Sequence, residues 1–168
     1  MSKLPSLAAE AWLNEPALQR LFTVLAAAGG EGRVAGGAVR NALLGEKVTE
    51  VDVATTLSPE HVTAACTAAG MGVHPTGIDH GTVTVVVDHH PFEVTTLRHD
   101  VETDGRRAKV RFTDDWEADA QRRDFTMNAL YCDAQGTIYD FVHGWPDVQQ
   151  RRVIFVGDAE QRIAEDYL

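Results

Sequence analysis

Three carboxylates are spaced along the chain so that they could share one metal site. Glu50 and Asp52 stand two residues apart in the alternating segment EVDVATT, and Glu93 lies in a second β-branched segment. Side chains two apart on a strand project from the same face, so adjacent strands would bring these acids together. Such hard oxygen ligands suit Mg²⁺, and two metals held this way can activate an attacking hydroxyl and stabilise a leaving pyrophosphate. From spacing alone, the alternating acids are explained better as the solvent-exposed face of a half-exposed strand than as a metal site.

A glycine pair and an arginine stand just ahead of these acids and could bind phosphate. Gly36 and Gly37 follow a short apolar segment and precede a helical one, where glycine lets backbone N–H groups come close to a phosphate. Arg40 falls about one turn into that helix, where it could clamp a phosphate or a carboxylate. The spacing matches neither the dinucleotide fingerprint nor a Walker loop, and an ordinary turn would explain the glycines as well. A bound divalent metal would offset the repulsion between a phosphate and the neighbouring carboxylates.

A second polar group, Arg122, Arg123 and Asp124, begins the segment RRDFTMNAL. Adjacent arginines ahead of an aspartate are typical of a phosphate clamp, and equally of a surface ion-pair cluster. Trp116 and Trp145 could stack on a base, but packing anchors are the favoured interpretation. No Ser–His–Asp or Cys–His set stands out in the sequence, so nucleophilic hydrolysis has no support.

The bulk composition excludes several classes of protein. The chain has 168 residues, 44% of them hydrophobic, and a formal net charge of −10, which argues against coating nucleic acid with its whole surface. Its segment 98–111 is nevertheless locally basic, with five Lys or Arg against three Asp or Glu. No apolar run approaches the ~20 residues that cross a bilayer, and the N-terminus is not a secretory signal. Cys66 and Cys132 lack metal-site spacing, so buried reduced thiols in a soluble, cytoplasmic protein without a membrane partner are predicted.

Helical and extended patterns alternate along the chain, and these elements must position the polar side chains. Apolar residues at helical spacing predict a helix in 16–30, and Ser58 followed by a proline predicts the start of another. Two β-branched segments in 81–98 predict a hairpin that turns at Asp88–Pro91, followed by a charged loop over 98–111. A mixed α/β fold with a mixed sheet follows. Further strands are expected within 33–37, 50–56, 114–133 and 136–158, and further helices at 38–45, at the start of 114–133 and from Asp158 onward.

Taken together, these segments resemble the head domain of the bacterial CCA-adding tRNA nucleotidyltransferases and their poly(A) polymerase relatives, in the polymerase-β-like nucleotidyltransferase superfamily. The resemblance runs from about Arg33 to Leu168 in the family's order, through GGAVRNALLG, EVDVATT, GTVTVVVDHHPFEVTTLR, TDGRRAKVRFTDDWEADAQRRDFTMNAL and DFVHGWPDVQQRRVIFVGDAEQRIAEDYL. It implies a mixed, mainly antiparallel sheet flanked by helices. It also implies a nucleotidyltransferase head (palm) domain over 1–150 and the truncated start of a helical neck domain over 151–168.

The resemblance assigns roles to the same polar residues. It implies that Glu50 and Asp52 are catalytic metal ligands, that Glu93 is the third acid, and that the metal is Mg²⁺. The glycine pair and the arginines would contact the nucleotide triphosphate, while Asp124 and Asn128 would contact the ribose and favour ribonucleotides. The implied nucleotide-binding residues are Gly36, Gly37, Arg40, Arg122, Arg123, Asp124, Asn128 and Asp166.

The implied activity is template-independent addition of CMP, CMP and AMP to tRNA 3′ ends, with CTP and ATP as substrates. A poly(A) polymerase that adds AMP to RNA is the alternative, because the head residues hardly separate the two. Glu50 and Asn41 each replace an aspartate that is usual in the family. Glu165 and Asp166 begin an acid–acid–x–x–arginine run, and the chain ends at Leu168, one residue before that arginine. We therefore expect a fragment of a longer enzyme, of low activity by itself, with a nucleotide-binding module without turnover as its alternative.

Overall fold

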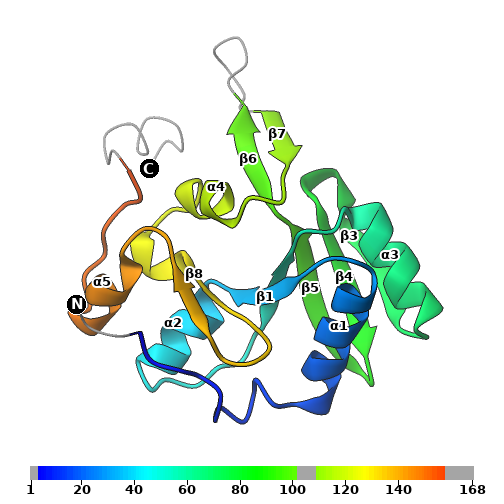
Figure 1. Cartoon of the computed structure of the whole chain (residues 1–168), viewed down its shortest axis with the longest axis horizontal. Helices are drawn as coiled ribbons and strands as arrows, with labels where there is room; N and C mark the ends of the chain where they lie inside the picture. The colour runs from blue at the N-terminus through cyan, green and yellow to red at the C-terminus, as the bar shows by residue number, and fades with distance from the viewer. Residues whose placement is uncertain (1–3, 102–108, 158–168) are drawn as a thin grey trace.

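The fold is built on a seven-stranded sheet, and Figure 1 shows how the helices surround it. The computed structural model describes residues 4–101 and 109–157. The strands run in the order β3-β4-β5-β2-β1-β8-β9, and among the pairs in these ranges only β2 with β5 is parallel. β6 and β7 form a separate two-stranded hairpin. The strands are β1 Gly32–Ala35, β2 Asp52–Thr55, β3 Gly72–Gly77, β4 Thr82–Val87, β5 His90–Thr96, β6 Arg98–Val101, β7 Lys109–Phe112, β8 Leu130–Cys132 and β9 Ile138–Asp140.

Helices of different length cover the sheet unequally. The first three pack with the larger hydrophobic cluster on one face, while α4 contributes to a smaller cluster on the other. The mixed, mainly antiparallel α/β fold predicted from the sequence is therefore confirmed. The helices are α1 Pro16–Ala27, α2 Gly37–Leu43, α3 Pro59–Ala68, α4 Trp116–Gln121 and α5 Gly144–Gln149, with short 3₁₀ segments at Ile78–His80 and Thr126–Asn128.

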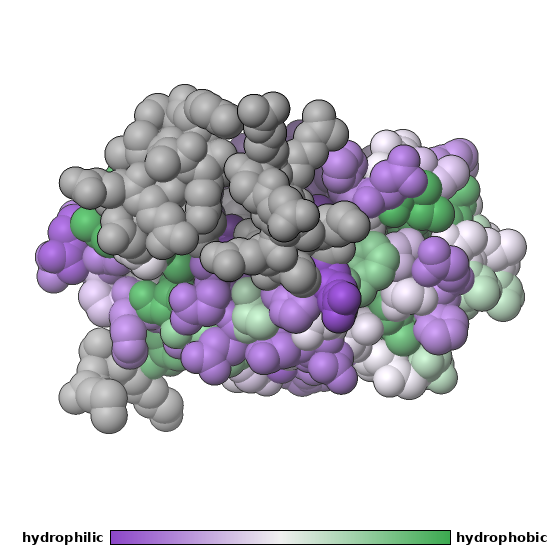
Figure 2. All heavy atoms as spheres, turned by 90° about the horizontal axis from the view of Figure 1, so that it is seen from above, coloured by the Kyte–Doolittle hydropathy of each residue, from purple (hydrophilic) through white to green (hydrophobic). Residues whose placement is uncertain are grey.

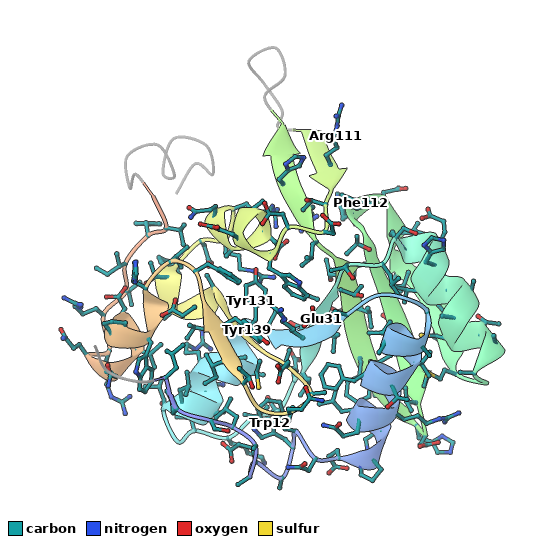
Figure 3. All side chains as sticks on the ribbon, in the orientation of Figure 1. Trp12, Glu31, Arg111, Phe112, Tyr131 and Tyr139 are labelled. Carbon is teal, nitrogen blue, oxygen red and sulfur yellow. The ribbon has the colours of Figure 1, made fainter. Side chains whose placement is uncertain are left out.

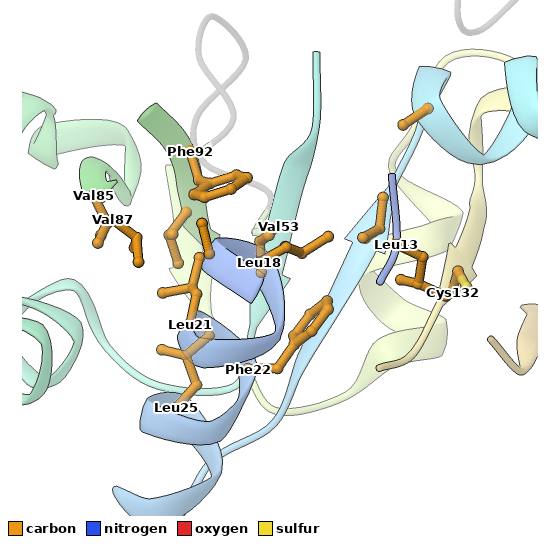
Figure 4. Close-up of a cluster of buried hydrophobic side chains, with 14 of the residues drawn as sticks. Leu13, Leu18, Leu21, Phe22, Leu25, Val53, Val85, Val87, Phe92 and Cys132 are labelled. Atoms are coloured by element: carbon orange, nitrogen blue, oxygen red, sulfur yellow. The ribbon is translucent and has the colours of Figure 1, made fainter. Parts of the chain in front are cut away.

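The main core lies between α1 and the sheet, as Figure 4 shows. Leu18, Leu21 and Leu25 of α1 are fully buried, and Phe22 is nearly so. These residues stand at helical spacing, so the amphipathic helix predicted within 16–30 is confirmed. Burying each such side chain stabilises the fold by about 1.5–3 kcal/mol relative to leaving it in water.

The opposite face of the sheet is covered only in part. Ala35 of β1 and Ala54 of β2 pack there with Tyr131 of β8 and Ala120 of α4. Alternate residues on a strand share a face, so Asp52 projects to this side as well, beyond the end of the small cluster. The uncovered part of this face is where the candidate site lies.

Several local predictions are confirmed by the structure. Ser58 accepts a hydrogen bond from the His61 N–H at 3.2 Å and caps α3, whose first residue is Pro59. β4 and β5 form the expected hairpin, and its two turn residues, Asp88 and His89, have φ of 48° and 69°. Such left-handed pairs match the twist of the flanking strands. The local chemistry of caps and turns was therefore sufficient to place these elements.

Some segments differ from the predictions, among them strand β3, which was not expected. The charged segment 98–111 is not a loop at its ends, because β6 and β7 pair there; residues 102–108 lie outside the described ranges. α5 was not expected within 136–158, and it begins where the Asp140 carboxylate accepts hydrogen bonds from the N–H groups of Gly144 and Trp145. Because the capping carboxylate belongs to the preceding strand and not to the residue just before the helix, the sequence has no recognisable capping residue at the start of α5. The helix expected from Asp158 also falls outside the described ranges.

Both cysteines are buried thiols, as predicted, and the visible surface mixes hydrophilic and hydrophobic side chains. Cys66 and Cys132 are buried and form no disulfide, and burial raises the pKa of the Cys66 thiol to about 11. In the face seen in Figure 2, hydrophobic side chains form separate groups among hydrophilic ones. None of the helices that the structure describes combines the length and the apolarity needed to cross a membrane.

Candidate active site

Asp52 and Glu93 lie side by side on the uncovered face of the sheet. The parallel strands β2 and β5 pair in a register that sets these two residues opposite each other, with Thr84 of β4 next in the row. The pKa of Asp52 is raised, first because its carboxyl group is partly removed from water and then because Glu93 and Glu50 add negative charge; Arg123 opposes the shift. The pair therefore carries negative charge that a cation would neutralise.

Glu50 does not lie on β2, contrary to the predicted alternation. The strand begins at Asp52, and Glu50 is exposed in the connection from α2. It lines a second hollow of about 500 Å³, which also reaches Trp12 and both acids of the pair. Within the described ranges, no group of three or more His, Cys, Asp or Glu side chains is arranged to hold a metal ion. The prediction that Glu50 lies on the same strand as Asp52 is therefore wrong, because strand pairing aligns Asp52 with Glu93 but does not extend to Glu50. A part for Glu50 in a metal site stays a prediction.

The aligned pair still has the donor chemistry that a hard divalent cation requires. Asp52 and Glu93 offer carboxylate oxygens, and Glu50 is near enough for its charge to raise the pKa of Asp52. Mg²⁺ commonly binds one or two protein carboxylates and completes its shell with water and substrate phosphates. The residues present therefore fit such an ion, with Glu50 as an adjacent acid.

A cleft of about 340 Å³ opens beside the pair and collects most of the predicted site residues. The start of α2 and the segment after α4 contribute its glycine and arginine walls. Glu50 does not line this cleft, and Asp166 lies outside the described residues. The predicted residues that line it are Gly36, Gly37, Arg40, Asp52, Glu93, Arg122, Arg123, Asp124 and Asn128.

The glycine pair brings bare backbone to the edge of the cleft. Gly36 has a positive φ of 73° and a ψ of −131°, a conformation that side chains disfavour. A Cβ atom on Gly37 would stand 3.3 Å from Nη2 of Arg40, tighter than ordinary packing allows. Glycine is thus favoured at Gly36 by its backbone conformation, whereas a Cβ at Gly37 would need the Arg40 guanidinium to shift by a few tenths of an ångström.

Arg40 belongs to a hydrogen-bonded chain with two other predicted residues. Its Nη1 donates to the side-chain oxygen of Asn128 at 2.7 Å, and the Asn128 amide nitrogen donates to Asp124 at 3.3 Å. Its Nε donates to the Asn41 side-chain oxygen at 3.1 Å, so Asn41 supplies an acceptor at the position where the resemblance led us to expect an aspartate. The two residues expected to contact ribose are therefore linked to the arginine expected to contact phosphate.

Arg123 is held by a second network that the sequence did not reveal. Its Nη2 donates to Asp119 and its Nε donates to the Tyr131 hydroxyl, each at 3.1 Å. Burial would lower the pKa of Arg123, but its interactions with Tyr131 and Asp119 outweigh this and raise it, so the guanidinium stays charged. Figure 3 shows Tyr131 at the β8–β9 end of the sheet, close to Tyr139, its cross-strand partner.

Other site residues were missed in the sequence. Asp119, Arg98 and Thr95 line the cleft, and Tyr131 stands behind Arg123. Asp119 precedes Arg123 by four residues, a spacing that favours an ion pair, and this signal could have singled it out. Trp116 packs edge-on against Tyr131, with ring centroids 5.1 Å apart, in accord with the expected packing anchor.

The fold and the cleft together are those of a nucleotidyltransferase head domain. More particularly, the chain belongs to the family described as the poly A polymerase head domain, whose model matches residues 32–154. The resemblance drawn from the sequence motifs is thereby confirmed.

Relatives of known name agree with this assignment. CCA tRNA nucleotidyltransferase 1, mitochondrial, of Danio rerio is 49% identical over 137 residues, which cover 81% of this chain and 32% of that protein. The CCA-adding enzyme of Oceanobacillus iheyensis is 41% identical over 160 residues, or 93% of this chain and 39% of that protein. The solved Bacillus stearothermophilus CCA-adding enzyme in complex with CTP superposes with a TM-score of 0.80 at 38% identity, over 90% of this chain and 35% of that one. The chain thus spans between about a third and two fifths of the length of these relatives.

Proposed function

We propose that this chain is the nucleotidyltransferase head of an enzyme that adds CMP, CMP and AMP to tRNA 3′ ends, using CTP and ATP without a template. The observation that carries the proposal is the cleft, where Asp52 and Glu93 share one space with Arg40 and Arg123. The acids suit a divalent metal and the arginines suit a triphosphate, and nucleotidyl transfer needs both in one site. Identity to relatives named CCA-adding enzymes, one of them solved with CTP, supports the same activity.

Mg²⁺ is the proposed cofactor, with Asp52 and Glu93 as its main ligands and Glu50 as the third. When bound, this metal would lower the pKa of the attacking RNA hydroxyl and neutralise charge on the departing pyrophosphate. The pKa of Asp52 is raised by its burial and then by Glu93 and Glu50, and Arg123 opposes this shift, so acids and an arginine act on the same carboxyl group.

The chain's own residues would bind and orient the nucleotide. Arg40 and Arg123, with the adjacent Arg122, would hold the triphosphate, and the bare backbone of the glycine pair would let it approach. Asn128 bridges Arg40 and Asp124, so a ribose hydroxyl could stand between Asn128 and Asp124, accepting from the amide nitrogen and donating to the carboxylate. The nucleotide sugar and its phosphates would then be fixed by one connected set of side chains.

The proposal also covers parts of the chain that the structure does not describe. By resemblance, residues 1–150 form the head, residues 151–168 begin the neck, and Asp166 takes part in reading the incoming base. The polynucleotide partner would be the tRNA 3′ end, and the compartment would be the cytoplasm. Because three relatives are named mitochondrial, cell fractionation is the appropriate check of the compartment.

The test is extension of a tRNA that lacks its terminal CCA, by the complete gene product with Mg²⁺, CTP and ATP, followed by sequencing of the products. Products that stop after CCA would support the proposal, whereas a long adenosine tail would assign the poly(A) activity in the family's name. Arg40→Gln should slow extension by about tenfold or more through loss of a phosphate contact. Arg20→Gln is the matched control, since Arg20 is exposed and pairs with Asp88 outside the cleft. A complete protein that neither extends tRNA nor binds CTP would overturn the proposal.

A further inference from the structure

A buried acid, Asp119, joins parts of the site that come from different elements. It lies on α4 and is 3% exposed. Its Oδ1 accepts a hydrogen bond from the backbone N–H of Arg98, at the start of β6, at 3.1 Å. Its Oδ2 accepts from the Tyr131 hydroxyl at 2.6 Å and from Nη2 of Arg123 at 3.1 Å. One oxygen therefore anchors the β6–β7 hairpin, while the other holds a cleft arginine and the tyrosine behind it.

These contacts fix the orientation of the Arg123 guanidinium. Nη2 and Nε are occupied by Asp119 and Tyr131, and no hydrogen bond joins Nη1 to another residue in the described ranges. Nη1 lies 3.9 Å from the position that a Cβ on Gly36 would take, at the edge of the cleft. A planar guanidinium held along one edge presents the remaining N–H groups in one direction. Here that direction is toward the glycine pair.

We propose that Asp119 is a positioning residue that presents Arg123 to the anionic part of the nucleotide and ties that arginine to the base of the β6–β7 hairpin. Asp119 makes no contact with substrate in this role; it acts through Arg123. The identity of the anion as a nucleotide triphosphate rests on the proposed function. The orientation of Arg123 is a property of this chain alone and can be measured without any ligand.

Asp119→Asn separates the two tasks of the carboxylate. The amide oxygen can still accept from the Arg98 N–H, while an NH₂ group replaces the oxygen that faces Tyr131 and Arg123. The Tyr131 hydroxyl can turn and accept from this NH₂ group, but Nη2 of Arg123 then has no acceptor. The expected result is a hairpin that stays anchored beside an arginine that is no longer held.

The matched control is Asp147→Asn. Asp147 is also buried, at 7% exposed, and it too accepts from a hydroxyl and an arginine, those of Thr126 and Arg152. It lies outside the cleft. Both variants break a charge-assisted pair between a buried carboxylate and an arginine, so both melting temperatures should fall, by less in Asp147→Asn because Arg152 is half exposed. A purely structural role for Asp119 predicts that triphosphate affinity changes to the same extent in the two variants.

Two measurements decide the matter. The first is the ¹⁵N-edited NMR signal of the Arg123 Nε–H, which is assigned by its loss in Arg123→Lys. This signal should be distinct and slow to exchange in the unchanged chain and in Asp147→Asn. In Asp119→Asn it should be neither. The second is titration with CTP and with inorganic triphosphate, for which Asp119→Asn should bind about tenfold or more weakly than Asp147→Asn. Tyr131→Phe removes the hydroxyl that accepts from the Arg123 Nε–H, so it should abolish the distinct Nε signal, whereas triphosphate affinity should fall less than in Asp119→Asn because Asp119 still holds Nη2. This variant serves if Asp119→Asn does not fold.

The outcomes are separable from those of the proposed function. A distinct Arg123 signal in Asp119→Asn and in Tyr131→Phe, or equal loss of triphosphate affinity in Asp119→Asn and Asp147→Asn, would overturn the role of Asp119. If the unchanged chain binds inorganic triphosphate but no CTP, the nucleotide assignment fails while the NMR comparison still supports the positioning of Arg123.

Discussion

Replacing Gly36 with alanine should weaken both the stability of the fold and the binding of nucleotide. The φ of 73° and ψ of −131° at Gly36 lie in a region that glycine alone readily occupies. Space is not the obstacle, because a Cβ would stand 3.8 Å from the Asn128 carbonyl oxygen and 3.9 Å from Nη1 of Arg123. The conformational cost is about 1–3 kcal/mol, offset by about 0.4–1 kcal/mol because alanine restricts the unfolded chain. The net loss lies between about 0 and 2.6 kcal/mol, and at its midpoint of about 1.3 kcal/mol Tm should fall by roughly 3–5 °C for a chain of this length.

Thermal unfolding and CTP titration would be compared between Gly36→Ala and Gly45→Ala. Gly45 also has a φ of 73°, but a Cβ there would meet no atom within 4 Å, and Gly45 does not line the cleft. Both variants should lose stability, whereas only Gly36→Ala should lose affinity, because its methyl group stands beside Arg123 where phosphate would approach. An unchanged Tm in Gly36→Ala would refute the conformational argument, and equal affinities in the two variants would refute the functional one.

Other substitutions test the acid pair, the core and a helix cap. Because the pKa of Asp52 is raised in the folded chain, its ionised form destabilises the fold once the pH exceeds the ordinary value of 3.8. Asp52→Asn should therefore raise Tm at neutral pH in metal-free buffer, and a gain that persists unchanged below that pH would contradict this. Leu18→Ala should lower the free energy of unfolding in denaturant titrations by about 2–5 kcal/mol, because Leu18 is fully buried; a loss under 1 kcal/mol would mean that the core closes around the gap. Ser58→Ala should cost about 0.5–2 kcal/mol through loss of the bond from the His61 N–H, and Ser58→Asn, which can still cap, should recover most of it.

Local patterns in the sequence predicted the elements that depend on local chemistry. The apolar spacing of Leu18, Leu21 and Leu25 defines the buried side of α1, and Ser58 defines the start of α3. Strand alternation also placed Glu93 on the polar face of β5, where it is exposed between buried neighbours. In these cases the side chain and the backbone group that it serves lie within a few residues of each other, so the sequence contains the whole interaction.

The remainder of the site depends on contacts between distant segments. Glu50 fits an alternating pattern, but only the pairing of β1 and β5 with β2 decides that the strand begins at Asp52. Asp119 had a helical spacing to Arg123, yet its burial depends on Tyr131 from β8. β3 was not predicted because most of its residues are exposed and lack an apolar alternation. Each of these features is set by a neighbour in space, which a single sequence does not identify.

The parallel pairing of β2 with β5 has a consequence for the order in which the chain folds. Parallel strands cannot be joined by a tight turn, and here the connection between them comprises α3, β3 and β4. The β4–β5 hairpin can form from neighbouring residues, but its docking against β2 must close that long connection, which is slower. A chain that has formed only its local hairpins would therefore have many of its strands and still keep Asp52 apart from Glu93. Affinity for a divalent metal would then report completion of the sheet, and the repulsion between the two acids would be met only in the last steps of folding.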